Sequence, residues 1–145
     1  MKNILFVCTG NTCRSPMAEF VLKDLLAKEG VTDVKVSSAG LAVRAGDTIC
    51  ANAKQTLKNN GIEVDEFESR QITEGMIEGS DLVLCMTQSH KRYLPQMDKI
   101  VTLGQVVDMP DVGDPFGYDL TVYNLCYQQI YNALTKFVQQ YFKKS

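Results

Sequence analysis

A short apolar run that passes through a loop into a helix is the feature that most constrains the fold. Ile4–Val7 is continuously apolar, which predicts a strand covered on both faces. Cys8–Arg14 follows as a loop, and Ser15 and Pro16 are typical of a helix start, as N-cap and first helical residue. Apolar residues then recur at helical spacing to about Glu29. A buried strand, a loop and a helix in this order predict the opening of a βαβ unit.

Further short apolar runs and helical patterns alternate along the chain. This alternation predicts an α/β fold in one domain, residues 1–145: an open, doubly wound, four-stranded parallel sheet with helices on both faces and flavodoxin-like strand order 2-1-3-4. The other strands are predicted at Val34–Ala39, Leu82–Met86 and Lys99–Thr102. Further helices are predicted at Ala51–Asn60, Ile72–Gly79, Thr87–Leu94 and Leu120–Phe142, and Leu103–Tyr118 is expected to be irregular. In such sheets ligands bind beyond the carboxyl ends of the strands, next to the first strand.

Charge and cysteine usage exclude several classes of protein. The formal net charge is −2, so no basic excess indicates nucleic-acid binding. No apolar run is long enough for a membrane span or a signal-peptide core, and we expect a cytoplasmic protein without a membrane partner. Five irregularly spaced cysteines and a single histidine, His90, favour neither a disulfide framework nor a metal site, and no cofactor is expected. Cys50, Cys85 and Cys126 are predicted to be core residues, and His90 is predicted on a polar helix face.

The loop between the first strand and the first helix has the composition of a phosphate-binding site. A helix N-terminus offers unpaired N–H groups and a positive dipole end, and Gly10 and Asn11 tolerate the positive φ that would curl the loop around an anion. We expect Cys8 to be a nucleophilic thiolate in this environment. Arg14 can hold two phosphate oxygens, and the Ser15 hydroxyl can donate to the thiolate. The predicted phosphate-binding residues are Thr9, Gly10, Asn11, Thr12, Cys13, Arg14 and Ser15.

The segment Cys8–Glu19, with the sequence CTGNTCRSPMAE, resembles the signature of the low-molecular-weight protein tyrosine phosphatases. The likeness extends over the whole chain: Ser37–Gly40 resembles the end of the family's second strand, and Asp114–Phe116 resembles its general-acid loop. The resemblance implies the family's fold and a two-step reaction without a metal. Cys8 would form a phosphocysteine, and Asp114 would protonate the leaving group and then activate water. Cys8, Arg14 and Asp114 are therefore the predicted catalytic residues.

Two of these assignments depend on the resemblance. On residue pattern alone, Asp108, Asp111 and Asp114 are equal candidates for the proton donor, and the Asp-Pro match selects Asp114. In the resembling family, the position of Cys13 can form a disulfide with the nucleophile, which implies a redox pairing of Cys8 with Cys13. A simple packing role for Cys13 is the alternative.

The same resemblance leaves two substrates open. Many tyrosine-directed members carry an aliphatic residue where this chain has Thr12, and paired aromatics where it has Phe116-Gly117. At these positions the chain resembles a bacterial branch of the family that dephosphorylates protein arginine. A planar cation seeks oxygens and a phenyl ring seeks an apolar wall, so Thr12 and Phe116 are the predicted selectivity residues. We expect phosphoarginine in proteins as the substrate, with phosphotyrosine as the alternative. The expected partners are phosphorylated proteins and inorganic phosphate or another oxyanion.

Two other functions fit fewer features of the sequence. A thioredoxin-linked arsenate reductase on this fold needs a relay pair of cysteines after the third strand, but Cys85 is followed by none in Thr87–Leu94. A non-catalytic phosphoprotein-binding module could keep Arg14 and lose Cys8 or Asp114, yet both are present. The predicted function is therefore a cysteine-dependent protein phosphatase.

Overall fold

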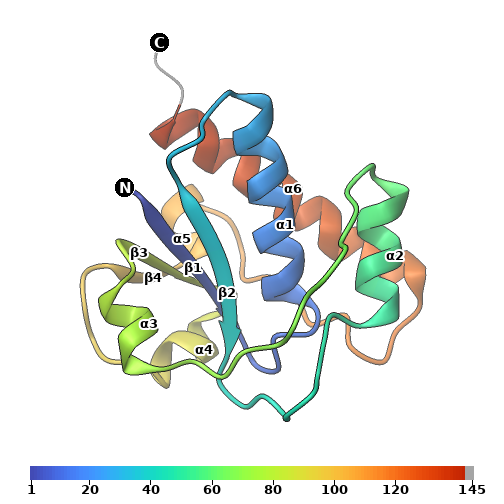
Figure 1. The fold of residues 1–145 in the computed structure, drawn as a ribbon, viewed down its shortest axis with the longest axis horizontal. Coiled ribbons are helices and arrows are strands. Elements are labelled where there is room, and N and C mark those ends of the chain that lie inside the picture. Colours follow the sequence, from blue (N-terminus) through green and yellow to red (C-terminus); the bar gives the residue numbers. More distant parts are fainter. Residues whose placement is uncertain (143–145) are drawn as a thin grey trace.

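A four-stranded parallel sheet forms the centre of the molecule (Figure 1). The computed structural model describes residues 1–142. The strands are β1 (Asn3–Cys8), β2 (Lys35–Gly40), β3 (Leu82–Cys85) and β4 (Ile100–Thr102). They lie in the order β2-β1-β3-β4, and every neighbouring pair is parallel. The predicted fold class and strand order are confirmed.

Helices cover both faces of this sheet. On one side lie α1 (Arg14–Lys28), α2 (Ala51–Asn59), α5 (Leu103–Val107) and α6 (Leu120–Tyr141), and on the other lie α3 (Glu74–Glu78) and α4 (Gln88–Arg92). Residues of β1 alternate between the two cores, with Ile4 and Phe6 on the α1 side and Leu5 and Val7 on the α3 side. Burial of each of these side chains stabilises the fold by about 1.5–3 kcal/mol.

The first helix begins two residues earlier than predicted, at Arg14 and not at Pro16. Its N-cap is Cys13, which makes no side-chain capping hydrogen bond, so the prediction of Ser15 as the N-cap is wrong. Ser15 lies inside the first turn, and its hydroxyl contacts Cys8 and Asn11 instead of a backbone N–H group. The Ser15 hydroxyl therefore bonds to side chains of the preceding strand end and loop, and not to the backbone of its own helix.

The stretch predicted to be irregular contains a further helix, α5. Thr102 and Gln105 form a capping box, in which each side chain bonds to the backbone of the other residue. The helix ends at Asp108, whose φ of 56° is left-handed. Gly104 is required here, because a Cβ at this position would lie 2.3 Å from the carbonyl oxygen of Met109.

The remaining predicted elements agree with the structure to within a few residues. Among residues 1–142, no helix has both the length and the hydrophobicity that a membrane span requires. In Figure 1, β1 and β2 point toward the lower edge of the molecule, where the chain turns into α1. That turn is the loop predicted to bind phosphate.

Candidate functional site

The loop of residues 9–13 is fixed in shape by Asn11. This residue has a φ of 54° and a fully buried side chain. Its Nδ2 donates to the hydroxyls of Ser15 and Ser38, each at 2.9 Å, and its Oδ1 accepts from the N–H of Arg70 at 2.9 Å. Gly10 and Asn11 were both expected to adopt a positive φ. Asn11 does so, but Gly10 is not among the described glycines with a positive φ.

The carbonyl groups of the loop point outward, to donors on neighbouring segments. The oxygens of Cys8, Thr9 and Thr12 accept from the N–H groups of residues 41, 42 and 50, at 2.9–3.0 Å. In the part of the chain that the structure describes, no protein acceptor is bonded to the N–H groups of residues 9–13. These free donors next to a helix N-terminus are the arrangement that binds an anion.

Gly40, at the end of β2, allows the close approach of this loop. A Cβ on Gly40 would lie 2.7 Å from the carbonyl oxygen of Thr9 and 2.9 Å from the backbone nitrogen of Asn11. Any larger residue would therefore displace the loop backbone.

Cys8 lies at the base of this loop, and its Sγ is 2.8 Å from the hydroxyl oxygen of Ser15. Asn11 donates to that oxygen, so the Ser15 hydrogen points to one of two acceptors, the Cys8 sulfur or the more distant Ala39 carbonyl at 3.5 Å. The Cys8 residue is only 3% exposed, yet it lines a hollow of about 640 Å³. The predicted site residues that line this hollow are Cys8, Thr9, Gly10, Thr12, Cys13, Arg14, Asp114 and Phe116. The other two, Asn11 and Ser15, are fully buried.

Arg14 and Asp114 meet at the side of this hollow. The Arg14 guanidinium is buried, donates to the carbonyl of Val112 at 3.2 Å, and places Nη2 3.6 Å from Asp114 Oδ2. The Asp114 side chain is 56% exposed, and its Oδ1 accepts from the N–H of Phe116 at 3.0 Å. The arrangement places a guanidinium and a solvent-accessible carboxylate in the same hollow as the thiol.

The three aspartates that the sequence pattern left equal are in different environments. Asp111 accepts from the N–H of Gln88 at the start of α4, and Asp108 is the left-handed residue that ends α5. Of the three, only Asp114 lines the hollow. The structure therefore gives each aspartate a separate local role.

His90 was predicted on a polar helix face, and this prediction is wrong. The residue is 5% exposed, with Nε2 2.9 Å from the hydroxyl of Thr9 and Nδ1 3.0 Å from the hydroxyl of Thr87. Burial, together with the nearby Arg14 charge, lowers the pKa of His90 to about 4. A neutral imidazole therefore links α4 to the anion-binding loop. The only sequence signal for this position of His90 is the Thr87-x-x-His90 spacing, in which the Thr87 side chain caps the helix by accepting from the N–H of His90.

This lowered pKa predicts a loss of stability in acid. An unfolded histidine binds a proton near pH 6.5, whereas folded His90 binds one only near pH 4. The free energy of unfolding should therefore fall between these pH values, by roughly 2–3 kcal/mol from this group. Urea denaturation of wild type and His90→Gln at about pH 7.5 and about pH 4.5 measures the difference. An equal loss in both proteins would contradict this role for His90.

Cys13 contacts a thiol other than the one expected. Its Sγ lies 3.4 Å from Sγ of Cys50 and 3.3 Å from the hydroxyl of Tyr123. Cys50 is half-buried and lines the hollow, so its prediction as a core residue is wrong. Cys85 and Cys126 are buried, as predicted.

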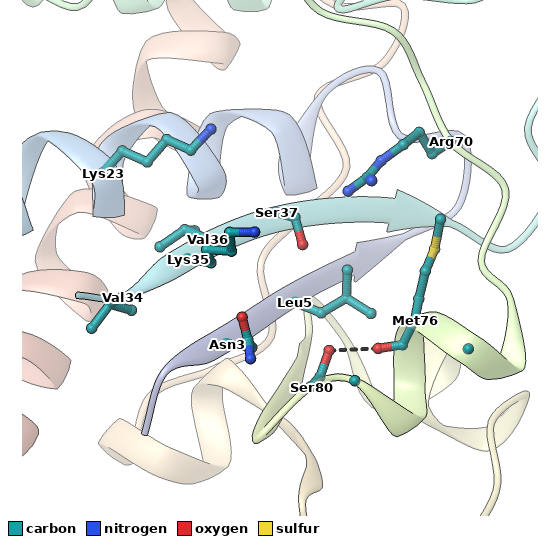
Figure 2. A pocket seen from close by; sticks show the side chains of 12 residues that line it. Asn3, Leu5, Lys23, Val34, Lys35, Val36, Ser37, Arg70, Met76 and Ser80 are labelled. Carbon is teal, nitrogen blue, oxygen red and sulfur yellow. Dashed lines mark hydrogen bonds between the residues drawn. The ribbon is translucent and has the colours of Figure 1, made fainter. Parts of the chain in front are cut away.

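A second hollow, of about 550 Å³, lies at the outer edge of β2 (Figure 2). Lys23, Lys35, Arg70 and Met76 are among the residues that line it, and none of its lining residues is a cysteine. Within residues 1–142, no group of three or more His, Cys, Asp or Glu side chains is arranged to hold a metal. The candidate active site is therefore the hollow at Cys8.

Fold and site together define the class of an α/β protein phosphatase with a thiol in its anion-binding loop. The family model described as low molecular weight phosphotyrosine protein phosphatase matches residues 3–145, and the chain belongs to this family.

Two relatives and one solved structure illustrate the similarity. The protein-arginine-phosphatase of Bacillus subtilis (strain 168) is 36% identical over 145 residues, covering 95% of each chain. The low molecular weight protein-tyrosine-phosphatase PtpB of Staphylococcus epidermidis is 32% identical over 139 residues, covering 92% of this chain and 94% of PtpB. A YwlE arginine phosphatase mutant with a phosphorylated active-site serine superposes with a TM-score of 0.91 at 35% identity, covering 98% of this chain and 97% of YwlE.

Proposed function

We propose that this phosphatase works through a phosphocysteine at Cys8 and removes phosphate from arginine side chains of proteins. The observation that carries the proposal is the position of Cys8 Sγ, 2.8 Å from a serine hydroxyl and beneath a loop whose N–H groups are free. The phosphorylated serine in the active site of the YwlE mutant also supports a phosphoenzyme.

In the first step the Cys8 thiolate attacks phosphorus. The three outer phosphate oxygens accept from the loop N–H groups and from Arg14, which stabilise the charge of the transition state. As the sulfur–phosphorus bond forms, the bond to the leaving group breaks, and Asp114 donates a proton to the departing nitrogen or oxygen. The exposed position of Asp114, 3.6 Å from Arg14, supports this assignment.

In the second step water hydrolyses the phosphocysteine. Asp114, now a carboxylate, takes a proton from water while the water oxygen attacks phosphorus. The sulfur–phosphorus bond breaks, phosphate leaves, and the Ser15 hydroxyl donates to the returning thiolate. The Cys8–Ser15 contact of 2.8 Å supports this role.

Thr12 and Asp114 favour phosphoarginine as the substrate. Both line the hollow, and their oxygens suit a planar cation that seeks hydrogen-bond acceptors. The 36% identity to an arginine phosphatase supports the same choice. Phosphotyrosine is a second candidate, because Phe116, which is 71% exposed at the rim, offers a flat apolar surface to a phenyl ring.

Replacing Thr12 with isoleucine tests the substrate. The change removes the hydroxyl and adds apolar volume, so the ratio of kcat/KM for phosphoarginine over phosphotyrosine peptides should fall about tenfold, equivalent to one hydrogen bond. Thr12→Ser keeps the hydroxyl and serves as the control, with an almost unchanged ratio. An unchanged ratio in Thr12→Ile would remove the main argument for arginine.

The proposal treats residues 1–145 as one phosphatase domain, which the family match to residues 3–145 supports. A phosphatase that depends on a reduced thiol requires a reducing compartment, so we propose that it works in the cytoplasm.

A further inference from the structure

Cys13, Cys50 and Tyr123 form a compact cluster behind the anion-binding loop. The two sulfurs are 3.4 Å apart, and the Tyr123 hydroxyl lies 3.3 Å from each of them. Tyr123 is 3% exposed and belongs to α6, whereas each cysteine directly precedes a helix, Cys13 before α1 and Cys50 before α2. Three separate helices therefore hold the two thiols in contact.

The backbone also ties the two cysteines together. The N–H of Cys50 donates to the carbonyl of Thr12 at 2.9 Å, so the segments that carry the thiols are already joined. A disulfide needs the sulfurs to approach to about 2.05 Å, which leaves a short movement from contact distance. The movement starts from two segments that already lie together, because the N–H of Cys50 is bonded to Thr12.

The two thiols differ in reactivity. The hydrogen bond between them lowers the pKa of Cys50 to about 6. The same hydrogen bond raises the pKa of Cys13, and the burial of Cys13 raises it further. These opposite shifts in pKa favour loss of the proton from Cys50 over loss of the proton from Cys13. Cys50 is also the more exposed of the two and lines the hollow at Cys8, so a small oxidant can reach it.

We propose that Cys13 and Cys50 form a reversible disulfide when the protein meets hydrogen peroxide, as a dithiol that is separate from Cys8. The Cys50 thiolate attacks one peroxide oxygen and the oxygen–oxygen bond breaks. The hydroxyl group that the Cys50 sulfur takes from the peroxide makes it a sulfenic acid, and hydroxide leaves. Cys13 sulfur then attacks the Cys50 sulfur, its own proton and the departing hydroxide form water, and the disulfide results. In total, one thiolate, one thiol and one peroxide give one disulfide, one water and one hydroxide.

This pair competes with Cys8 for Cys13. The resemblance of the loop to its family implies a Cys8–Cys13 disulfide, yet the Cys13 thiol contacts Cys50. While Cys13 is bound to Cys50, Cys8 stays reduced or is oxidised alone. Replacement of Cys50 by serine should therefore increase the share of Cys8–Cys13 disulfide at a given peroxide dose.

Peptide mapping distinguishes the two disulfides. Trypsin cuts after Lys2, Arg14, Arg44 and Lys54, so Cys8 and Cys13 stay on one peptide and Cys50 lies on another. The full-length protein is treated with a small excess of hydrogen peroxide, alkylated with N-ethylmaleimide and digested without reductant. We expect the two peptides to be linked in wild type and in Cys8→Ser, and to separate after reduction. In Cys13→Ser and Cys50→Ser the link should be absent.

Cys126→Ser is the matched control, because this buried thiol lies outside the cluster and its loss should leave the link in place. Two results would overturn the proposal: no linked peptides in wild type while a Cys8–Cys13 bond forms within the single peptide, or a link that persists in Cys13→Ser. The experiment measures the mass of linked peptides and not a rate of hydrolysis. Its result therefore does not depend on the catalytic role proposed for Cys8.

Discussion

Replacing Cys8 with serine is expected to reduce the hydrolysis of an aryl phosphate by about 10⁴-fold or more. A serine hydroxyl is not ionised near neutral pH and is a much weaker nucleophile than a thiolate. The donors of the anion site are backbone N–H groups and Arg14, which the substitution leaves in place. Binding of inorganic phosphate, measured by calorimetry, should therefore change by no more than about threefold.

Cys126→Ser provides the control for this prediction. It makes the same change of sulfur to oxygen at another buried cysteine, whose Sγ is 3.7 Å from the carbonyl of Gly113, so the new hydroxyl has an acceptor within reach. Its activity should stay close to that of wild type. If Cys8→Ser kept a substantial part of the activity, a thiolate nucleophile at this position would be contradicted.

Asp114→Asn should slow the reaction in proportion to how poor the leaving group is. An amide keeps the shape of the side chain but has no proton to donate, so a substrate with a poorly stabilised leaving group should lose about 10²–10³-fold in kcat/KM. An activated aryl phosphate leaves without help, and its first step should change only a few-fold. The measurement is kcat/KM across a series of aryl phosphates with different leaving-group acidity.

Asp111→Asn and Asp108→Asn are matched controls for Asp114→Asn. All three aspartates lie in the same segment after β4, but Asp108 ends α5 and Asp111 accepts from Gln88. Neither control should change the dependence of rate on leaving group. A uniform loss across the series in Asp114→Asn would exclude Asp114 as the proton donor.

The fold was predictable because its signals are local. The apolar run of β1 and the helical spacing of α1 and α6 are set by nearby residues, and these elements fall where the sequence places them. The capping box of α5 is also a local signal, in the Thr102-x-x-Gln105 spacing.

The support of the site was not predictable from local patterns. Asn11 bonds to Ser38, 27 positions away, and His90 bonds to Thr9, 81 positions away. Cys50 meets Cys13 across 37 positions. No periodicity or spacing relates such residues, because the fold brings them together only after the sheet and helices have packed. The sequence could therefore indicate the proposed nucleophile and its loop, but not the side chains that hold the loop.

The most direct test of the account is to trap phosphate on Cys8. In Asp114→Asn an activated aryl phosphate should still react with the thiolate, while hydrolysis of the product is slowed because the base is absent. The protein is denatured during turnover at mildly alkaline pH, digested with trypsin, and peptide 3–14 is fragmented in a mass spectrometer. We expect one phosphoryl group on Cys8 and none on Cys13. Peptide 3–14 without phosphate during active turnover, or a phosphoryl group on any other residue, would contradict the account.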